Sequence, residues 1–81
     1  MPRLRRLGAR DVLRVLHAFG FEVVSIRGSH AKVVRIGMGG HKEILVVPVK
    51  RRLAIGTLHA IYRQACRFIP EERLRPHFFT D

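Results

Sequence analysis

The tripeptide Gly28-Ser29-His30 holds the residue types in this 81-residue chain that are best suited to acid–base chemistry. An imidazole titrates near neutral pH, so His30 can accept one proton and donate another. RNA cleavage needs both steps, because the 2′-hydroxyl loses a proton and the leaving 5′-oxygen gains one. Gly28 lets a phosphate backbone approach closely. A simpler alternative stays open at this point: Gly28 and Ser29 form a hairpin turn, and His30 only begins a strand.

Two other kinds of chemistry are disfavoured by the residues that are missing around the tripeptide. A nucleophilic Ser29 would need a carboxylate to orient His30, and only Asp11 and Glu22 precede position 43. The five histidines lack the close spacing of a zinc site, and the single cysteine, Cys66, has no second cysteine to pair with. We therefore expect neither serine hydrolase chemistry nor a bound metal, and no small-molecule cofactor.

The chain is strongly basic, with sixteen Lys and Arg residues against six Asp and Glu and a formal net charge of +10. Such a charge favours a polyanionic partner, because cations that neutralise phosphates release counterions. Nucleic acid is the first candidate and an anionic membrane the second. The chain has no apolar run of about 18 residues that could span a bilayer, and its first residues do not resemble a secretory signal. We expect a cytoplasmic protein that binds RNA and no membrane.

Several cations are placed where they could bind a phosphate backbone. Lys32 has the same strand parity as His30, so the two side chains should share one face of a sheet. The run Lys50-Arg51-Arg52 lies just before a predicted helix start at Gly56-Thr57, with Thr57 as the N-cap. The cations and the free N–H groups of that helix could together hold one phosphate, although a solvated basic loop is the alternative.

Other charged or titratable residues could extend this surface. His41 is a candidate second proton carrier if the strand that follows it pairs with the strand of His30. Arg35 should face the side of the sheet opposite to Lys32. The remaining cations that could track a nucleic-acid backbone lie on the two predicted helices: Arg10, Arg14, Arg63 and Arg67.

Hydrophobic periodicity predicts the elements that must position these residues. Apolar residues at helical spacing indicate a helix over 9–19, which ends at a glycine. Runs rich in Val and Ile indicate strands over 21–27, 30–36 and 42–49, and a second helix follows from Gly56. The order α-β-β-β-α predicts an α+β, two-layer sandwich: a three-stranded antiparallel sheet with both helices on one face and the other face open.

The end of the chain is expected to add an appendage to this frame. Pro48 should lie at an edge position or at the exit of its strand, because proline cannot donate a ladder hydrogen bond. A further short helix should begin at Pro70 and end at Pro76, followed by the apolar pair Phe78-Phe79. We expect one domain over 1–81, with 68–81 docked on it.

Three ordered motifs in this small basic chain resemble one known family. They are Gly28-Ser29-His30, the strand end Val46-Val47-Pro48-Val49, and the helix start Gly56-Thr57-Leu58 that continues Ile61-Tyr62-Arg63-Gln64-Ala65. Over about residues 9–67 the chain resembles HicA-type toxins of bacterial or archaeal toxin–antitoxin pairs. The resemblance implies a fold like a double-stranded-RNA-binding domain. It also implies an mRNA interferase that works without the ribosome, and an acidic HicB-type antitoxin that masks it.

The resemblance also assigns roles to particular residues. It implies that His30 is required for cleavage and that Gly28 and Ser29 form the turn that presents it. Many members carry a histidine where this chain has Lys50, which we interpret as a change of role toward electrostatic stabilisation of the phosphorane.

The hypothesis that follows is a metal-independent endoribonuclease. His30 is its general acid or base, Lys32 and Lys50 stabilise phosphate charge, and Arg51 and Arg52 hold the backbone. A noncatalytic RNA-binding module and a basic adaptor for an acidic protein are the alternatives.

Overall fold

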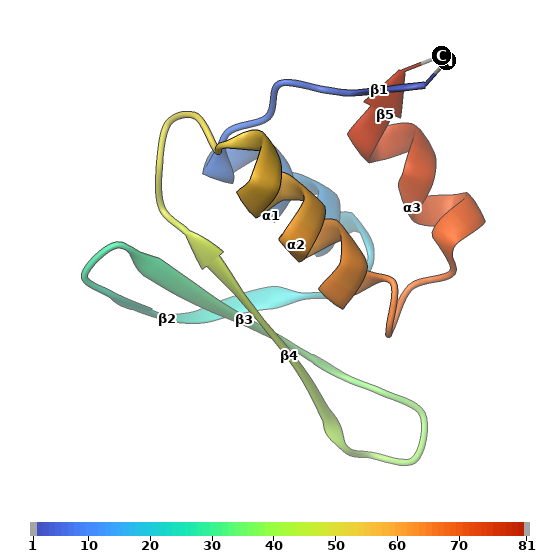
Figure 1. The fold of residues 1–81 in the computed structure, drawn as a ribbon. Coiled ribbons are helices and arrows are strands. Elements are labelled where there is room, and N and C mark those ends of the chain that lie inside the picture. The colour runs from blue at the N-terminus through green and yellow to red at the C-terminus, as the bar shows by residue number, and fades with distance from the viewer. Residues whose placement is uncertain (1, 81) are drawn as a thin grey trace.

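The computed structural model describes residues 2–80, which form an α+β fold of two layers (Figure 1). The first layer is an antiparallel sheet in the order β2-β3-β4, built from β2 (Glu22–Arg27), β3 (His30–Ile36) and β4 (Lys42–Pro48). The second layer consists of helices α1 (Ala9–Ala18) and α2 (Ile55–Ala65), which pack on the sheet. The predicted α-β-β-β-α order and the three-stranded antiparallel sheet are confirmed.

Helix α1 ends through a glycine cap that redirects the chain into the sheet. Gly20 adopts a φ of +97°, a left-handed conformation that favours glycine. The N–H of Gly20 donates to the carbonyl of His17 at 2.9 Å, and the N–H of Phe21 donates to that of Leu16 at 3.0 Å, which is the Schellman pattern. Phe21 is thereby buried at the entrance to β2.

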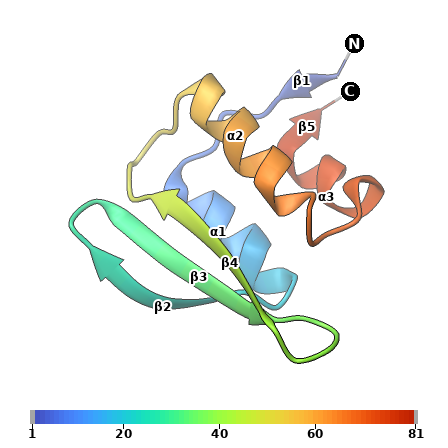
Figure 2. The ribbon, with the colours of Figure 1, turned by 60° about the horizontal axis from the view of Figure 1, so that its bottom comes forward.

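The two faces of the sheet differ because side chains alternate along each strand. Ala31 and Val33 of β3 and Leu45 and Val47 of β4 are buried beneath the helices. Their neighbours in the sequence are exposed or partly exposed, and Figure 2 shows that the ribbons of the helices lie on one side of the sheet. Pro48 is the last residue of β4, an edge strand, as predicted. One face of the sheet is therefore open.

Arg35 ties both helices to the covered side of the sheet. Its Nε donates to Oε1 of Glu43 at 2.7 Å, and its two terminal nitrogens donate to the carbonyls of Phe19 at 2.9 Å and Phe68 at 2.8 Å. The guanidinium also lies 4.9 Å from the ring centroid of Phe21. Arg35 faces away from Lys32, as its parity predicted, but its donors are engaged within the fold. The expectation that it extends a nucleic-acid surface was wrong.

Helix α2 begins earlier than the sequence indicated. Ala54 is its N-cap, with an extended backbone, and the carbonyl of Ala54 accepts the N–H of Leu58 at 2.9 Å. Thr57 lies inside the first turn and does not cap the helix, so that prediction was wrong. Threonine is a preferred N-cap residue, so the sequence indicated Thr57. Ala54 has no side-chain oxygen, so nothing in the sequence marked it as the cap. The buried stripe of α2 consists of Leu58, Ile61, Tyr62 and Ala65.

The C-terminal segment forms α3 (Glu71–Phe78), and Pro76 lies inside this helix. The prediction that the helix ends at Pro76 was therefore wrong. Pro76 removes one helical hydrogen bond, but Leu74 and Phe78 lie one turn apart and are fully buried, and this burial holds the helix together. Two short strands, β1 (Arg3–Leu4) and β5 (Phe79–Thr80), then pair antiparallel. Figures 1 and 2 both show this pair beside α3, away from the main sheet.

Candidate active site

The turn between β2 and β3 presents the candidate histidine at one end of the open sheet face. Arg27 and His30 are paired across it, so only Gly28 and Ser29 form the loop. Gly28 has a φ of +56° and no residue other than glycine has a positive φ in the described chain, which matches the type II′ turn of two-residue hairpins. The N–H of Val49 donates to the carbonyl of Ser29 at 2.6 Å and fastens the turn to the exit of β4.

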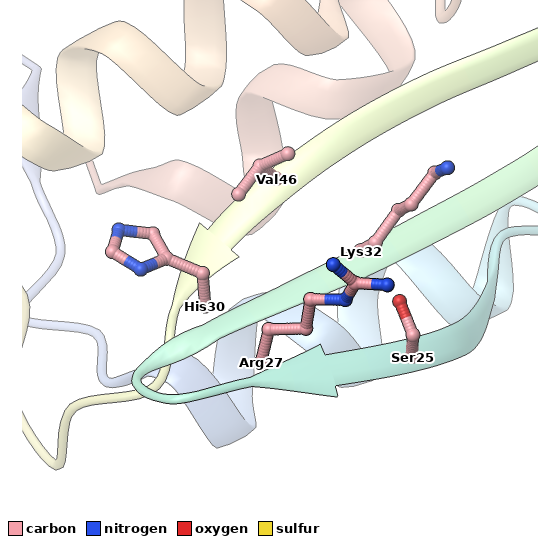
Figure 3. Close-up of a pocket in the computed structure, with 5 residues that line it drawn as sticks. All are labelled: Ser25, Arg27, His30, Lys32 and Val46. Carbon is pink, nitrogen blue, oxygen red and sulfur yellow. The ribbon is translucent and has the colours of Figure 1, made fainter.

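His30 lies in a shallow depression of about 410 Å³ on the open face (Figure 3). The strand register explains why these side chains lie together. On β2, Arg27 is paired with His30 and Ser25 with Lys32. On β4, Val46 is paired with Lys32. All five of these residues line the depression. The sheet therefore gathers a titratable imidazole and two cations on one surface.

The depression is electrostatically positive. None of the described residues that line it is acidic. The two carboxylates of the main sheet are engaged elsewhere, because Glu22 lies 3.3 Å from His17 and Glu43 binds Arg35 on the covered face. His30 is exposed, and no hydrogen bond joins its ring to another described side chain. Both ring nitrogens are therefore accessible to a ligand, and the cations favour an anionic one.

Lys50 lies beside the turn without lining the depression. It follows Val49, whose N–H is held by Ser29, and the carbonyl of Lys50 accepts the N–H of Ala9 at 2.9 Å. Arg51 and Arg52 continue this exposed loop toward the beginnings of α1 and α2. The loop of Lys50, Arg51 and Arg52 is thus fixed by its backbone and carries its cations outward.

Two residues suggested by the sequence are not close to His30. His41 precedes β4 at the opposite end of the hairpin, where Lys42 pairs with Ile36. Ile36 lies six residue steps from His30 along β3, about 20 Å at the rise of a strand. Thr57 is half-buried in the first turn of α2 and lines none of the depressions around the site. His41 is consequently excluded as a direct proton partner of His30.

Sequence reasoning missed Arg27 and Ser25. Arg27 was identifiable, because a two-residue turn forces the residue before Gly28 to oppose His30. The facing of Ser25 depends on an irregularity of register between Val23 and Ser25, which leaves Val24 without a partner on β3. Nothing in the alternation of apolar residues along β2 signals that bulge.

The residues that the structure describes contain no group of three or more His, Cys, Asp or Glu side chains arranged to hold a metal ion. Within the same range no helix is long and apolar enough to cross a membrane.

The fold and this face define a small basic α+β domain whose open sheet presents a histidine among cations. A family model described as the HicA toxin of bacterial toxin–antitoxin matches residues 9–65, and the chain belongs to this family. No curated protein and no solved structure matches the chain. The matched range contains the turn, all three strands of the main sheet and both helices that cover it. The resemblance inferred from three short motifs is confirmed.

Proposed function

We propose that this toxin is a metal-independent endoribonuclease that cleaves mRNA without the ribosome, with His30 as its general acid–base group. The observation that supports this most directly is the placement of His30 beside Arg27 and Lys32 in a depression without a described carboxylate. Family membership adds the biological context of a toxin. The two cations attract the phosphate, and the accessible imidazole handles the proton.

The reaction needs only the RNA and this histidine for its proton balance. Neutral His30 removes the proton of a 2′-hydroxyl, and the 2′-oxygen attacks the adjacent phosphorus. The bond between phosphorus and the 5′-oxygen breaks, and the imidazolium returns its proton to that leaving oxygen. The products are a 2′,3′-cyclic phosphate and a 5′-hydroxyl. Such general acid–base catalysis contributes typically about 10²- to 10⁴-fold in rate.

Cations around His30 lower the cost of the charge that develops on the phosphorane. Lys32 and Arg27 lie in the same depression as His30, whereas Lys50 stands beside the turn. Arg51 and Arg52 bind the neighbouring backbone phosphates. Gly28 and Ser29 position the histidine and take no part in proton transfer. Fixed cations of this kind stabilise charge that is greater in the transition state than in the substrate.

The protein partner in this proposal is an acidic HicB-type antitoxin. On the open face Ile44 is 44% exposed and Val46 46% exposed, next to the cation of Lys32. A partner with carboxylates and apolar side chains would fit this mixed surface and cover His30. It would thereby exclude RNA from the toxin.

The decisive experiment compares His30→Ala with His41→Ala in EDTA on labelled mRNA. Both histidines are exposed and lie at opposite ends of the same hairpin, so the second variant is a matched control. We expect His30→Ala to lose at least about 100-fold in cleavage rate and His41→Ala to cleave as wild type does. Products should end in a 2′,3′-cyclic phosphate. Equal cleavage by the two variants would refute the role of His30.

A noncatalytic RNA-binding module is the second candidate. It is favoured by one specific observation: among the described residues, no second imidazole lines the depression of His30, and His41 lies at the far end of the hairpin. This candidate predicts that wild type and His30→Ala shift RNA mobility equally and that neither cleaves it.

A further inference from the structure

A second basic surface lies at the end of the molecule formed by the β1–β5 pair. A groove of about 470 Å³ runs there between the N-terminal segment and the beginning of α2. Its cationic or titratable lining residues are Arg3, Arg5, Arg6 and His59, and its apolar lining residues are Leu4, Leu53, Ile55 and Leu58. An adjoining depression is lined by Arg6 and Arg52. We name this surface the arginine groove.

The N-terminal segment that carries these arginines is held in place by the fold. The N–H of Arg5 donates to the carbonyl of Phe78 at 2.7 Å, and the N–H of Leu53 donates to the carbonyl of Leu7 at 3.1 Å. The side chains of Leu4 and Leu7 pack against the hydrophobic core. In Figures 1 and 2 the segment passes the start of α2 and ends beside β5. Its arginines are therefore displayed from an ordered backbone.

The arginine groove has no counter-charge among the described residues. No described carboxylate lines it, and none lies within salt-bridge distance of Arg5, Arg6 or Arg52. The nearest acids in the sequence act elsewhere: Asp11 accepts the N–H of Gly8 at 2.9 Å, and Glu43 accepts the Nε–H of Arg35 at 2.7 Å. Exposed guanidinium groups without internal partners are available to an anion.

The Lys50–Arg52 loop connects the candidate active site with the edge of the arginine groove. The loop Lys50–Arg52 begins at the exit of β4, where the turn of His30 is fastened, and ends at the depression shared by Arg6 and Arg52. Cations are thus placed along one path from the histidine to the arginine groove. A repeating array of phosphates matches such a path better than the scattered carboxylates of a folded protein do.

We propose that the arginine groove binds the RNA backbone on one side of the scissile phosphate, so that the RNA extends from the sheet face across the Lys50–Arg52 loop. This inference rests on the proposed function, since it takes RNA as the ligand. Arg5 and Arg6 lie outside the residues 9–65 that match the family model. The groove therefore adds to this chain a contact that the matched core does not supply.

The test measures RNA affinity in the non-cleaving His30→Ala background, which keeps the binding result independent of catalysis. Arg5→Gln/Arg6→Gln is compared with Lys42→Gln/Arg73→Gln, a control that removes the same charge from exposed residues outside the groove. The probes are fluorescent single-stranded RNAs of about 4 and about 20 nucleotides, one at the lower end of the site sizes of small binding domains and one longer than their upper end of about 16 nucleotides. Thermal unfolding verifies that every variant is folded.

We expect the groove variant to lose about 10-fold in affinity for the long RNA, and its plot of log affinity against log salt to flatten by about 1.4. The short RNA should bind equally to both variants, because it fits on the sheet face alone. Crosslinking of 4-thiouridine RNA should label the segment before α1.

Equal losses for groove and control variants on the long RNA would overturn the proposal. So would a loss of polyglutamate binding with unchanged RNA binding, because it would assign the groove to an acidic protein. Either outcome leaves cleavage at His30 intact, which is measured separately.

Discussion

Arg35 and Glu43 face each other across β3 and β4, with Nε and Oε1 2.7 Å apart, and this pair joins the sheet to the ends of both covering helices. Glu43 is 9% exposed, so its carboxylate depends on Arg35 for a partner. The pair lies at the end of the sheet opposite to His30. The stabilising Arg35–Glu43 pair and the candidate catalytic His30 therefore lie at opposite ends of β3 and β4.

Replacing Arg35 with Met should destabilise the fold by about 2–3 kcal/mol, because Glu43 loses its charged partner and two helix-end carbonyls lose a donor. Glu43→Gln retains an acceptor for Arg35 and should cost less. Urea denaturation measures both free energies of unfolding. A Met variant as stable as wild type would show that the interactions of Arg35 contribute no net stability.

Gly28→Ala should reduce both stability and cleavage. The Cβ has open space, so the penalty is conformational: a φ of +56° costs an L-residue about 1–2 kcal/mol. Gly28→Asn tolerates the left-handed region better and should keep more activity. Chemical denaturation and single-turnover cleavage of the same RNA measure the two effects. An alanine variant with wild-type stability and rate would mean that the turn does not need glycine.

Lys50→Ala should slow cleavage about 10-fold if its ammonium stabilises the phosphorane, and Lys50→Arg should retain most of the rate. Lys50→His places a titratable group beside the turn, so its pH–rate profile should gain a limb near neutral pH. Lys42→Ala, at the far end of the sheet, controls for the loss of one charge. Equal rates for Lys50→Ala and Lys42→Ala would remove Lys50 from the mechanism.

Tyr62 should make the stability of the fold sensitive to alkaline pH. Burial, and then the hydrogen bond to Glu71, raise the pKa of Tyr62 to about 12 from an ordinary value of 10.0. The folded state therefore holds the phenol proton more tightly than the unfolded state does. This contribution is complete below pH 10.0 and is lost as pH rises toward about 12.

Tyr62→Phe isolates that contribution. The variant should lose about 1 kcal/mol at neutral pH from the missing hydrogen bond. Between pH 10.0 and about 12, wild type should lose stability more steeply than the variant does, by up to about 1.4 kcal/mol per pH unit. Urea denaturation across this range gives the difference directly. Parallel curves would argue against a raised phenol pKa.

Much of the fold could be predicted because hydrophobic periodicity reports which face of each element is buried. Val12 and Leu16 marked the helix, and Gly20 marked its end through a conformation that glycine favours. The start of α2 was not predicted correctly, because Ala54 caps the helix through its backbone alone. The β1–β5 pair escaped because strands of two residues are too short to show a period.

The candidate site was predictable in part for a related reason. Strand parity places Lys32 beside His30 whatever the rest of the fold does. The engagement of Arg35 depends on the carbonyls of Phe19 and Phe68, which converge only after α1 and α2 pack. The separation of His41 from His30 follows from hairpin register, because residues at the far loop of a hairpin cannot reach the opposite end of its strands.

The β1–β5 pair has a consequence for motion in the chain. Arg3 pairs with Thr80, so almost the whole sequence lies between the two strands, and closing so long a loop carries one of the largest entropic costs in the molecule. Two residue pairs, the hydrogen bond from the N–H of Arg5 to the carbonyl of Phe78 and the packing of Leu4 and Phe79 against the core offset that cost. This contact should form late in folding and open first by local fraying, while the core stays closed. Hydrogen exchange of the Arg5 amide should therefore be faster than that of the Val33 amide. The fraction of molecules in which β1 and β5 are paired then determines how much of the protein has a complete arginine groove.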